Sequence, residues 1–328
     1  MEALKHFHEA FPDVLNLVRP ILHLINGAIS RPDHQLNSSG RVSLDICSLG
    51  ELIDRFHTHE ATLHHDKVYA LLGMSSASAA SLLPDYSVPW KELLGRLVKS
   101  VLSEHVFVEA LDHRGIAVIK IRGCVIGNVS SVSGYQDGRK SISIVLKDTR
   151  KLRDYSKEER TRWTLQASAM SVQEGDLVCT LQGTSNPIII RPCIDYFAFI
   201  MISAIPLEAT RTESEIIKPQ VSSQSITDFP YDFLLVWNWE VSSQNLQNGG
   251  ECGTFTEVIV RVSGHSEKGL EDNLAKGARL QNVALILQDW GEYSKAGKRL
   301  EEATKVYEKL VGKKDLRTLS NMASLAIN

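Results

Sequence analysis

The change of hydrophobic period near Gly115 constrains the fold of this chain more than any other feature. Between residues 116 and 129, β-branched residues alternate with small or polar ones, which is the period of a half-buried strand. Before this segment, at Leu49, Leu52 and Phe56, and again beyond residue 271, apolar residues recur at helical spacing. The chain should therefore have an α+β fold, with an N-terminal helical segment, a small β-barrel or sandwich module and a C-terminal α-helical hairpin.

We expect four parts along the chain. They are a helical segment over 1–110, a small β module over 115–206, a connector with irregular or β elements over 207–270, and an incomplete helical repeat over 271–328. Within the first part, a helix is predicted over about 3–29, and another begins after Ser87, whose hydroxyl can cap it. Gly73 suits a left-handed helix stop. In the β module, Gly123 and Gly127 are typical of bulges or turns.

Composition excludes several classes of partner. With 36 basic and 39 acidic side chains and a net charge of -3, the chain has no excess charge that favours nucleic acid or an anionic membrane. Its five cysteines are scattered and form no C-x-x-C pair, which argues against a disulfide framework or a zinc knuckle. There is no secretory signal and no stretch long enough to span a bilayer. We expect a cytoplasmic protein with no nucleic-acid or membrane partner.

The C-terminal part resembles a tetratricopeptide repeat. Gly291, Tyr293, Ala296, Leu300 and Ala303 stand at the spacings at which two antiparallel helices of such a unit meet, and the small alanines permit close approach. The Val283-Ala284 and Leu325-Ala326 pairs lie 42 residues apart, as in the long-period repeats of kinesin light chain. One hairpin cannot bury its own apolar face, so it should dock on the preceding body or belong to a longer array. A generic amphipathic hairpin is the alternative.

Two further segments resemble a known family. The sequence Asp-Lys-Val-Tyr-Ala-Leu-Leu-Gly at 66–73, followed by Pro-Asp-Tyr-Ser at 84–87, is similar to the closing signature of the fungal heterokaryon-incompatibility (HET) domain. A second match joins residues 175–183 to 187–192, and the resemblance covers roughly residues 45–205. The positions that carry it are Asp66, Lys67, Tyr69, Gly73, Pro84, Asp85, Tyr86, Gly175, Asp176, Gly183, Arg191 and Pro192.

These motif positions predict architecture rather than chemistry. Asp66 should lie near a helix start, where its charge favours the helix dipole, and Tyr69 should lock that helix against its neighbours. Gly175 and Gly183 should form the turns into and out of a strand. Arg191 could bind an anion, although an arginine at a strand end more often reaches solvent or pairs locally.

The resemblance implies a role in fungal self and non-self recognition. Relatives begin with a TIR-like region that carries tyrosine-serine-tyrosine and tryptophan-glycine motifs, and no such segment precedes Asp66. We therefore predict a non-catalytic interaction or regulatory protein without cofactor or metal, which binds a protein partner through its C-terminal repeat.

Other chemistry stays open as an alternative. His57, His59, His64 and His65 stand near carboxylates and could bind a metal, although a solvated patch is the commoner outcome. Cys47 could act as a nucleophile with one of these histidines, although a structural cysteine is favoured. No phosphate-binding loop or nucleophile elbow occurs. A cryptic nucleotide-cleaving enzyme or thiol hydrolase, or a truncated gene fragment, are therefore the rival hypotheses.

Overall fold

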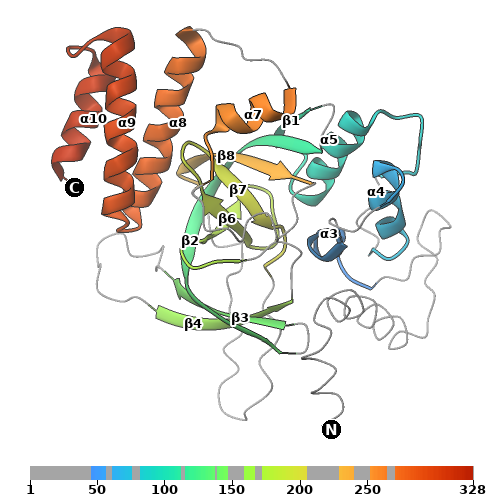
Figure 1. Cartoon of the computed structure of the whole chain (residues 1–328). Coiled ribbons are helices and arrows are strands. Elements are labelled where there is room, and N and C mark those ends of the chain that lie inside the picture. Colours follow the sequence, from blue (N-terminus) through green and yellow to red (C-terminus); the bar gives the residue numbers. More distant parts are fainter. Residues whose placement is uncertain are drawn as a thin grey trace, which may run out of the picture.

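The fold combines helices with a large mixed sheet, as the α+β prediction requires (Figure 1). The computed structural model describes residues 46–56, 61–75, 82–111, 115–136, 139–146, 159–166, 172–204, 229–239, 252–263 and 270–327. The helix predicted over 3–29, together with His57 and His59, lies outside these residues. The sheet lies between a group of N-terminal helices and a group of C-terminal helices.

The N-terminal helices are α3 (Leu49–Phe56), α4 (His64–Leu72) and α5 (Trp90–Val101). The helix α3 begins with a capping box, which was not among the predicted features. The Ser48 amide and hydroxyl both donate to the Glu51 carboxylate, and the Glu51 amide donates to the Ser48 hydroxyl. These bonds satisfy donors that the first turn of a helix leaves open.

Two expectations about helix ends are wrong. Gly73 follows α4 with φ -66°, in the right-handed region, so no left-handed stop forms there. Ser87 does not cap α5, because its hydroxyl donates to Asp85 and the helix begins only at Trp90, after Pro89.

In the part of the chain that the structure describes, the sheet has eight strands: β1 (Phe107–Leu111), β2 (Ile116–Gln136), β3 (Arg139–Leu146), β4 (Glu159–Gln166), β5 (Leu177–Leu181), β6 (Ile188–Pro192), β7 (Phe197–Met201) and β8 (Tyr231–Asn238). Their order is β4-β3-β2-β5-β6-β7-β8, with β1 beside β2. All pairings are antiparallel except that of β7 with β8. The strand β8 lies within the range expected for the connector, so that range contributes directly to the sheet.

The long strand β2 organises this sheet. Its first half pairs with β1 and β8, its middle with β5, and its last part with β3. The path β2-β5-β6-β7-β8 therefore returns to β2. The register shifts between Val125 and Gly127, which confirms that a glycine marks a bulge here. At Gly123, which pairs with both β5 and β8, a Cβ would lie 2.8 Å from the Thr180 carbonyl oxygen.

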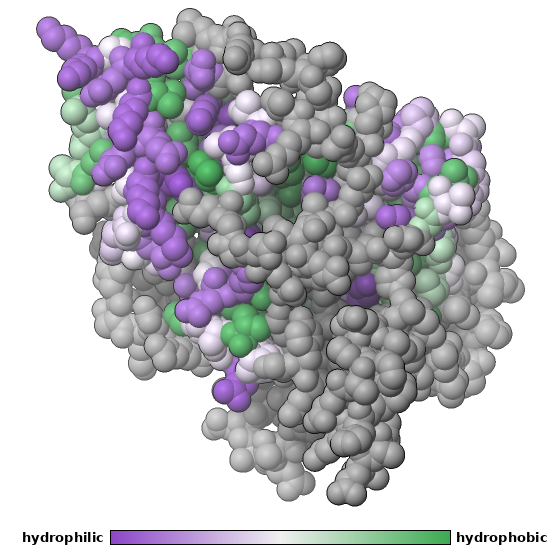
Figure 2. All heavy atoms as spheres, in the orientation of Figure 1, coloured by the Kyte–Doolittle hydropathy of each residue, from purple (hydrophilic) through white to green (hydrophobic). Residues whose placement is uncertain are grey.

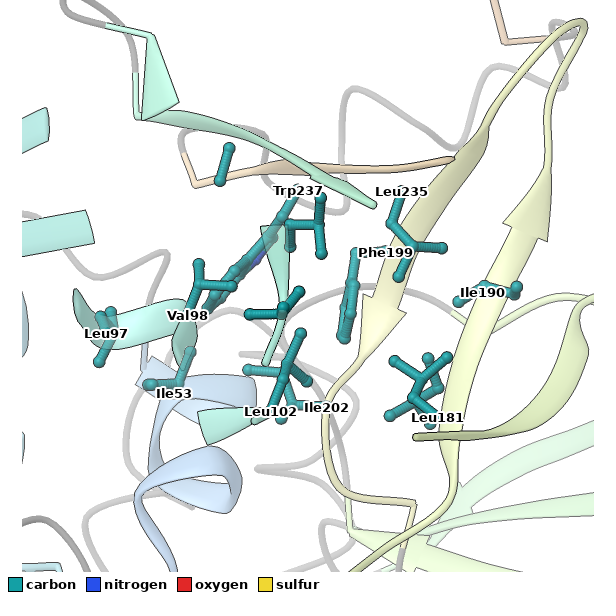
Figure 3. Close-up of a cluster of buried hydrophobic side chains, with 14 of the residues drawn as sticks. Ile53, Leu97, Val98, Leu102, Leu181, Ile190, Phe199, Ile202, Leu235 and Trp237 are labelled. Atoms are coloured by element: carbon teal, nitrogen blue, oxygen red, sulfur yellow. The ribbon is translucent and has the colours of Figure 1, made fainter. Parts of the chain in front are cut away.

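One hydrophobic core joins the N-terminal helices to the sheet (Figure 3). Side chains of α3 and α5, such as Ile53 and Val98, face Phe199 and Trp237 on the strands. The same cluster includes Val283 of the C-terminal helices. Trp239 is also buried in it. Residues of the ranges 1–110 and 115–206 thus contribute to one core.

The C-terminal helices are α7 (Phe255–Ser263), α8 (Leu270–Asp289), α9 (Tyr293–Val311) and α10 (Leu316–Ile327). A short turn containing Gly291 (φ +77°) joins α8 to α9, and Ala296 and Ala303 are fully buried, as the repeat pattern predicts. Tyr293 differs, because this residue is 56% exposed. Within the described residues, no helix combines the length and the apolar character that a membrane span requires.

Candidate functional site

The first motif, which consists of residues 66–73 and 84–87, holds the loop before α5 against α4 by hydrogen bonds. The Tyr86 hydroxyl donates to the Asp66 carboxylate (2.7 Å), and the Tyr69 hydroxyl donates to the Asp85 carbonyl oxygen (2.8 Å). The two tyrosine rings meet edge to face with centroids 5.2 Å apart. The structure therefore brings together most of the first motif, and its hydrogen bonds serve the fold.

The remaining residues of this motif lie around the clamp. Pro84 is exposed in the loop, and Lys67 is half-buried on α4. The Asp85 carboxylate accepts hydrogen bonds from the hydroxyl and the amide of Ser87, and these bonds lower the pKa of Asp85. This local turn orients the loop before α5 begins.

The second motif, which consists of residues 175–183 and 187–192, contains a buried ion pair. Arg191 Nε donates to Asp176 Oδ1 at 2.7 Å, and a terminal guanidinium nitrogen donates to Oδ2 at 2.9 Å. Burial opposes the charged form of Arg191, but the hydrogen bond and charge of Asp176 outweigh it, and the pKa of Arg191 is raised. The anion that Arg191 binds is therefore a carboxylate of its own chain, and the arginine is buried rather than directed to solvent.

Both motif glycines make the turns that the sequence predicts. Gly175 (φ +87°) precedes β5 and donates its amide to the Val129 carbonyl, and Gly183 (φ +86°) follows β5. The Gln173 amide donates to Asp176 Oδ2 at 2.7 Å, so the turn also fixes the carboxylate. Pro192 ends β6 and leads into the tight turn toward β7.

Asp195, in that turn, links the sheet to the C-terminal helices. Its carboxylate accepts a bond from the Phe255 amide at the start of α7 (2.7 Å) and from Arg279 Nε of α8 (2.9 Å). The Arg279 guanidinium also lies over the Phe255 ring, 4.7 Å from its centroid. No sequence pattern indicates this junction, because its members are 60 and 84 residues apart and belong to no motif.

The structure separates the described residues proposed for thiol chemistry. Cys47 forms a backbone bridge with Ser75, beyond the C-terminal end of α4, whereas His64 and His65 begin that helix. Nine helical residues span about 13 Å, which is too far for a nucleophile and its base. His65 is engaged with the Val88 carbonyl oxygen at 2.7 Å. In the described part of the chain, no three potential metal ligands of the His, Cys, Asp or Glu type gather together.

The helix α10 presents an apolar face to solvent. Leu316, Leu319 and Met322 follow each other at three-residue spacing and are 81%, 49% and 45% exposed. On the same helix, Thr318 and Asn321 are buried instead. Apolar patches lie among hydrophilic side chains at this helical end of the molecule (Figure 2). The exposed Lys313 and Lys314 precede α10 in the chain and are separated from it by Asp315.

Comparison with known proteins does not assign the chain to a family. No family model, curated protein or solved structure matches it.

Proposed function

We propose that this chain is a non-catalytic interaction protein, which binds a protein partner through the apolar face of α10. The residues that resemble the HET family place the proposed role in fungal self and non-self recognition, in the cytoplasm. This part of the proposal depends on the resemblance alone.

The observation that carries the interaction role is the exposure of Leu316, Leu319 and Met322. Side chains of this size are usually buried, and three of them on successive turns form a continuous apolar strip. The strip lies on the last of three helices that pack in sequence, since α9 contacts both α8 and α10. This succession, with its buried alanines, supports a tetratricopeptide-like unit, a class whose surfaces bind peptides and proteins.

The charge around the strip indicates what kind of partner fits. Lys313 and Lys314 precede the apolar residues, whereas Asp315 is engaged by Arg317. An amphipathic helix with leucine-like side chains and neighbouring acidic residues would match both features. The partner proposed is therefore a protein segment of this type.

The roles of the motif residues support the non-catalytic part of the proposal. Asp66, Asp176 and Arg191 each form hydrogen bonds within the chain that hold an element in place. The closed path of strands supports the small-barrel form of the β module. The Cys47 hypothesis receives no such support from His64 or His65, because α4 separates them.

Affinity capture with matched variants tests this function. The wild-type chain and a Leu316→Ser/Leu319→Ser variant are used side by side on a lysate of a filamentous fungus, with Leu83→Ser as the control. Leu83 is an exposed leucine far from α10 in the sequence. We expect a protein that both the wild type and Leu83→Ser retain and the double variant loses, and whose purified form binds the wild type directly.

The opposite result is equally clear. If the double variant retains every specific protein that the wild type retains, the α10 face is not the binding surface and the proposed function is wrong. Circular dichroism of the three proteins shows whether the helices are intact.

A further inference from the structure

The exposed side of α10 carries large apolar residues in its first half and small ones in its second half. Four exposed residues follow each other there at intervals of three, four and three positions: Leu316, Leu319, Ala323 and Ala326. This is the spacing at which one helix packs along another. The opposite side of α10 faces the molecule, because Thr318 and Asn321 are buried.

The helix α8 shows how such a face is covered elsewhere in the same molecule. The pattern Leu-x-Asn-x-Ala occurs at 280–284 in α8 and again at 319–323 in α10. In α8, which packs along α9, the leucine and the alanine of this pattern are fully buried, whereas in α10 both are exposed. At Gly277 of α8, an added Cβ would lie 2.8 Å from the Tyr307 ring of α9. A large side chain of one helix therefore packs directly on a small residue of the other.

We propose that α10 packs against α10 of a second copy of this chain, in antiparallel orientation about a twofold axis near residue 321. In this register, Leu319 of each copy faces Ala323 of the other copy. In the same way, Leu316 of each copy faces Ala326 of the other. Every layer of the contact then pairs one large with one small side chain, as in the contact between α8 and α9. The twofold axis repeats each pairing, so both copies use the same surface.

The charges near α10 favour the antiparallel orientation over a parallel one. Lys313 and Lys314 are exposed and lie before the first turn of α10. Parallel packing would bring these lysines of both copies together, and it would place leucine opposite leucine and alanine opposite alanine. In antiparallel packing the lysines approach the C-terminal end of the other helix, where the helix dipole favours positive charge. Because α10 lies at the outer edge of the C-terminal helices, a second copy can reach it (Figure 1).

The dimer contact uses the surface to which the proposed function assigns a protein partner, so a second copy and that partner compete. The helix α10 contains no acidic residue. A partner helix with acidic residues near Lys313 and Lys314 gains ion pairs that a second copy does not offer. Such a partner would therefore displace the second copy. This consequence, unlike the dimer itself, rests on the proposed function.

Sedimentation velocity of the full chain tests the dimer. One helix from each copy forms a contact smaller than the roughly 1,200–2,000 Å² of a standard interface, so we expect dissociation in the micromolar range. Between about 1 and 100 µM, the mean mass should rise from 36.5 kDa toward twice this value. No variant is needed for this first measurement.

Variants of two exposed residues test the register. Leu319→Ala should weaken association roughly tenfold or more, because it removes buried apolar surface from two layers of the dimer. The double variant Leu319→Ala/Ala323→Leu should restore association, because leucine again faces alanine. Leu285→Ala on α8 is the control and should leave association unchanged, since Leu285 is 42% exposed and Leu319 is 49% exposed.

Three results would overturn the inference: a wild-type chain that stays monomeric at about 100 µM, a dimer that Leu319→Ala leaves unchanged, or a double variant that associates no better than Leu319→Ala. The affinity capture separates this inference from the proposed function. A monomeric chain that loses its captured protein in Leu316→Ser/Leu319→Ser supports the function and contradicts the dimer. A dimer that Leu319→Ala weakens, but whose Leu316→Ser/Leu319→Ser form retains every captured protein, does the reverse.

Discussion

Arg191 and Asp176 face each other across the β5–β6 hairpin, one position beyond the pair formed by Leu177 and Ile190. Two short hydrogen bonds join them, and their side chains are only 11% and 1% exposed. A charge in this position is stable because its partner compensates it, so the loss of either residue leaves the other buried and unpaired.

Removal of one partner of this ion pair should therefore strongly destabilise the folded protein. We expect Arg191→Ala or Asp176→Ala to lower the free energy of unfolding by about 3–5 kcal/mol. The free energy of unfolding of the double variant Asp176→Leu/Arg191→Met should fall by much less than the sum of the losses in the two single variants, because the double variant buries no unpaired charge. Urea denaturation measures all three, and Arg96→Ala, which breaks an exposed pair with Glu92, is the control with a loss below about 1 kcal/mol. Additive losses in the double variant would contradict this account.

Asp54 makes stability depend on pH. Its carboxylate on α3 accepts hydrogen bonds from the Ile202 and Ser203 amides, and burial raises its pKa from 3.8 to about 7. Because the folded pKa exceeds the unfolded one, its stabilising contribution is complete below pH 3.8 and is lost as the pH rises toward 7, with a slope of at most about 1.4 kcal/mol per pH unit. We expect Asp54→Asn to remove this slope. Denaturation curves at several pH values compare the variants, and identical slopes would show that Asp54 does not titrate in this range.

Replacement by alanine should have opposite effects on stability at two glycines that lie at the ends of secondary-structure elements. At Gly183, φ is +86° and a Cβ would lie 2.5 Å from Ser103 Oγ, so Gly183→Ala should cost about 1–3 kcal/mol. At Gly73, φ is -66° and nothing lies within 4 Å of an added Cβ. Gly73→Ala should therefore be neutral or stabilise by up to about 1 kcal/mol. Thermal unfolding tests both, and a strongly destabilised Gly73→Ala would mean that its conformation differs from the one described.

The Asp195 junction should control how firmly α7 is held. Asp195→Ala removes the acceptor for the Phe255 amide and the charge that binds Arg279. We expect hydrogen exchange at the Phe255 amide to become at least about tenfold faster, since a hydrogen bond to a charged group contributes roughly 1.5–3 kcal/mol. The control is Glu292→Ala, which breaks an exposed pair with Lys295 and should leave α7 unchanged. Unchanged exchange in Asp195→Ala would show that other contacts hold this helix.

The sequence predicts local features of this fold better than distant ones. Helical spacing at Leu52 and Ile53, the strand period after Gly115 and the turns at Gly175 and Gly183 are all local patterns, and the structure confirms them. The prediction at Gly73 was wrong because a glycine permits a left-handed stop without requiring one.

The candidate sites depend on contacts that local patterns do not encode. The Asp176–Arg191 pair had a signal, since a hairpin between the two motif segments would place them opposite each other. In contrast, Asp54 meets Ile202 from a position 148 residues away, and Asp195 meets Arg279 from a position 84 residues away. Only the folded sheet brings such residues together.

The pairing of β2 with β8 also determines when the sheet and its core can form during synthesis. Residues 116–123 pair with β8, so one edge of this strand lacks its neighbour until Tyr231–Asn238 has left the ribosome. Until then, Leu235 and Trp237 cannot contribute to the shared core. The N-terminal helices therefore lack part of the sheet surface on which they pack in the folded protein. Contacts of such long sequence separation slow folding. During synthesis, the N-terminal half therefore keeps part of its apolar surface exposed to solvent until a strand more than a hundred residues later in the sequence has been made.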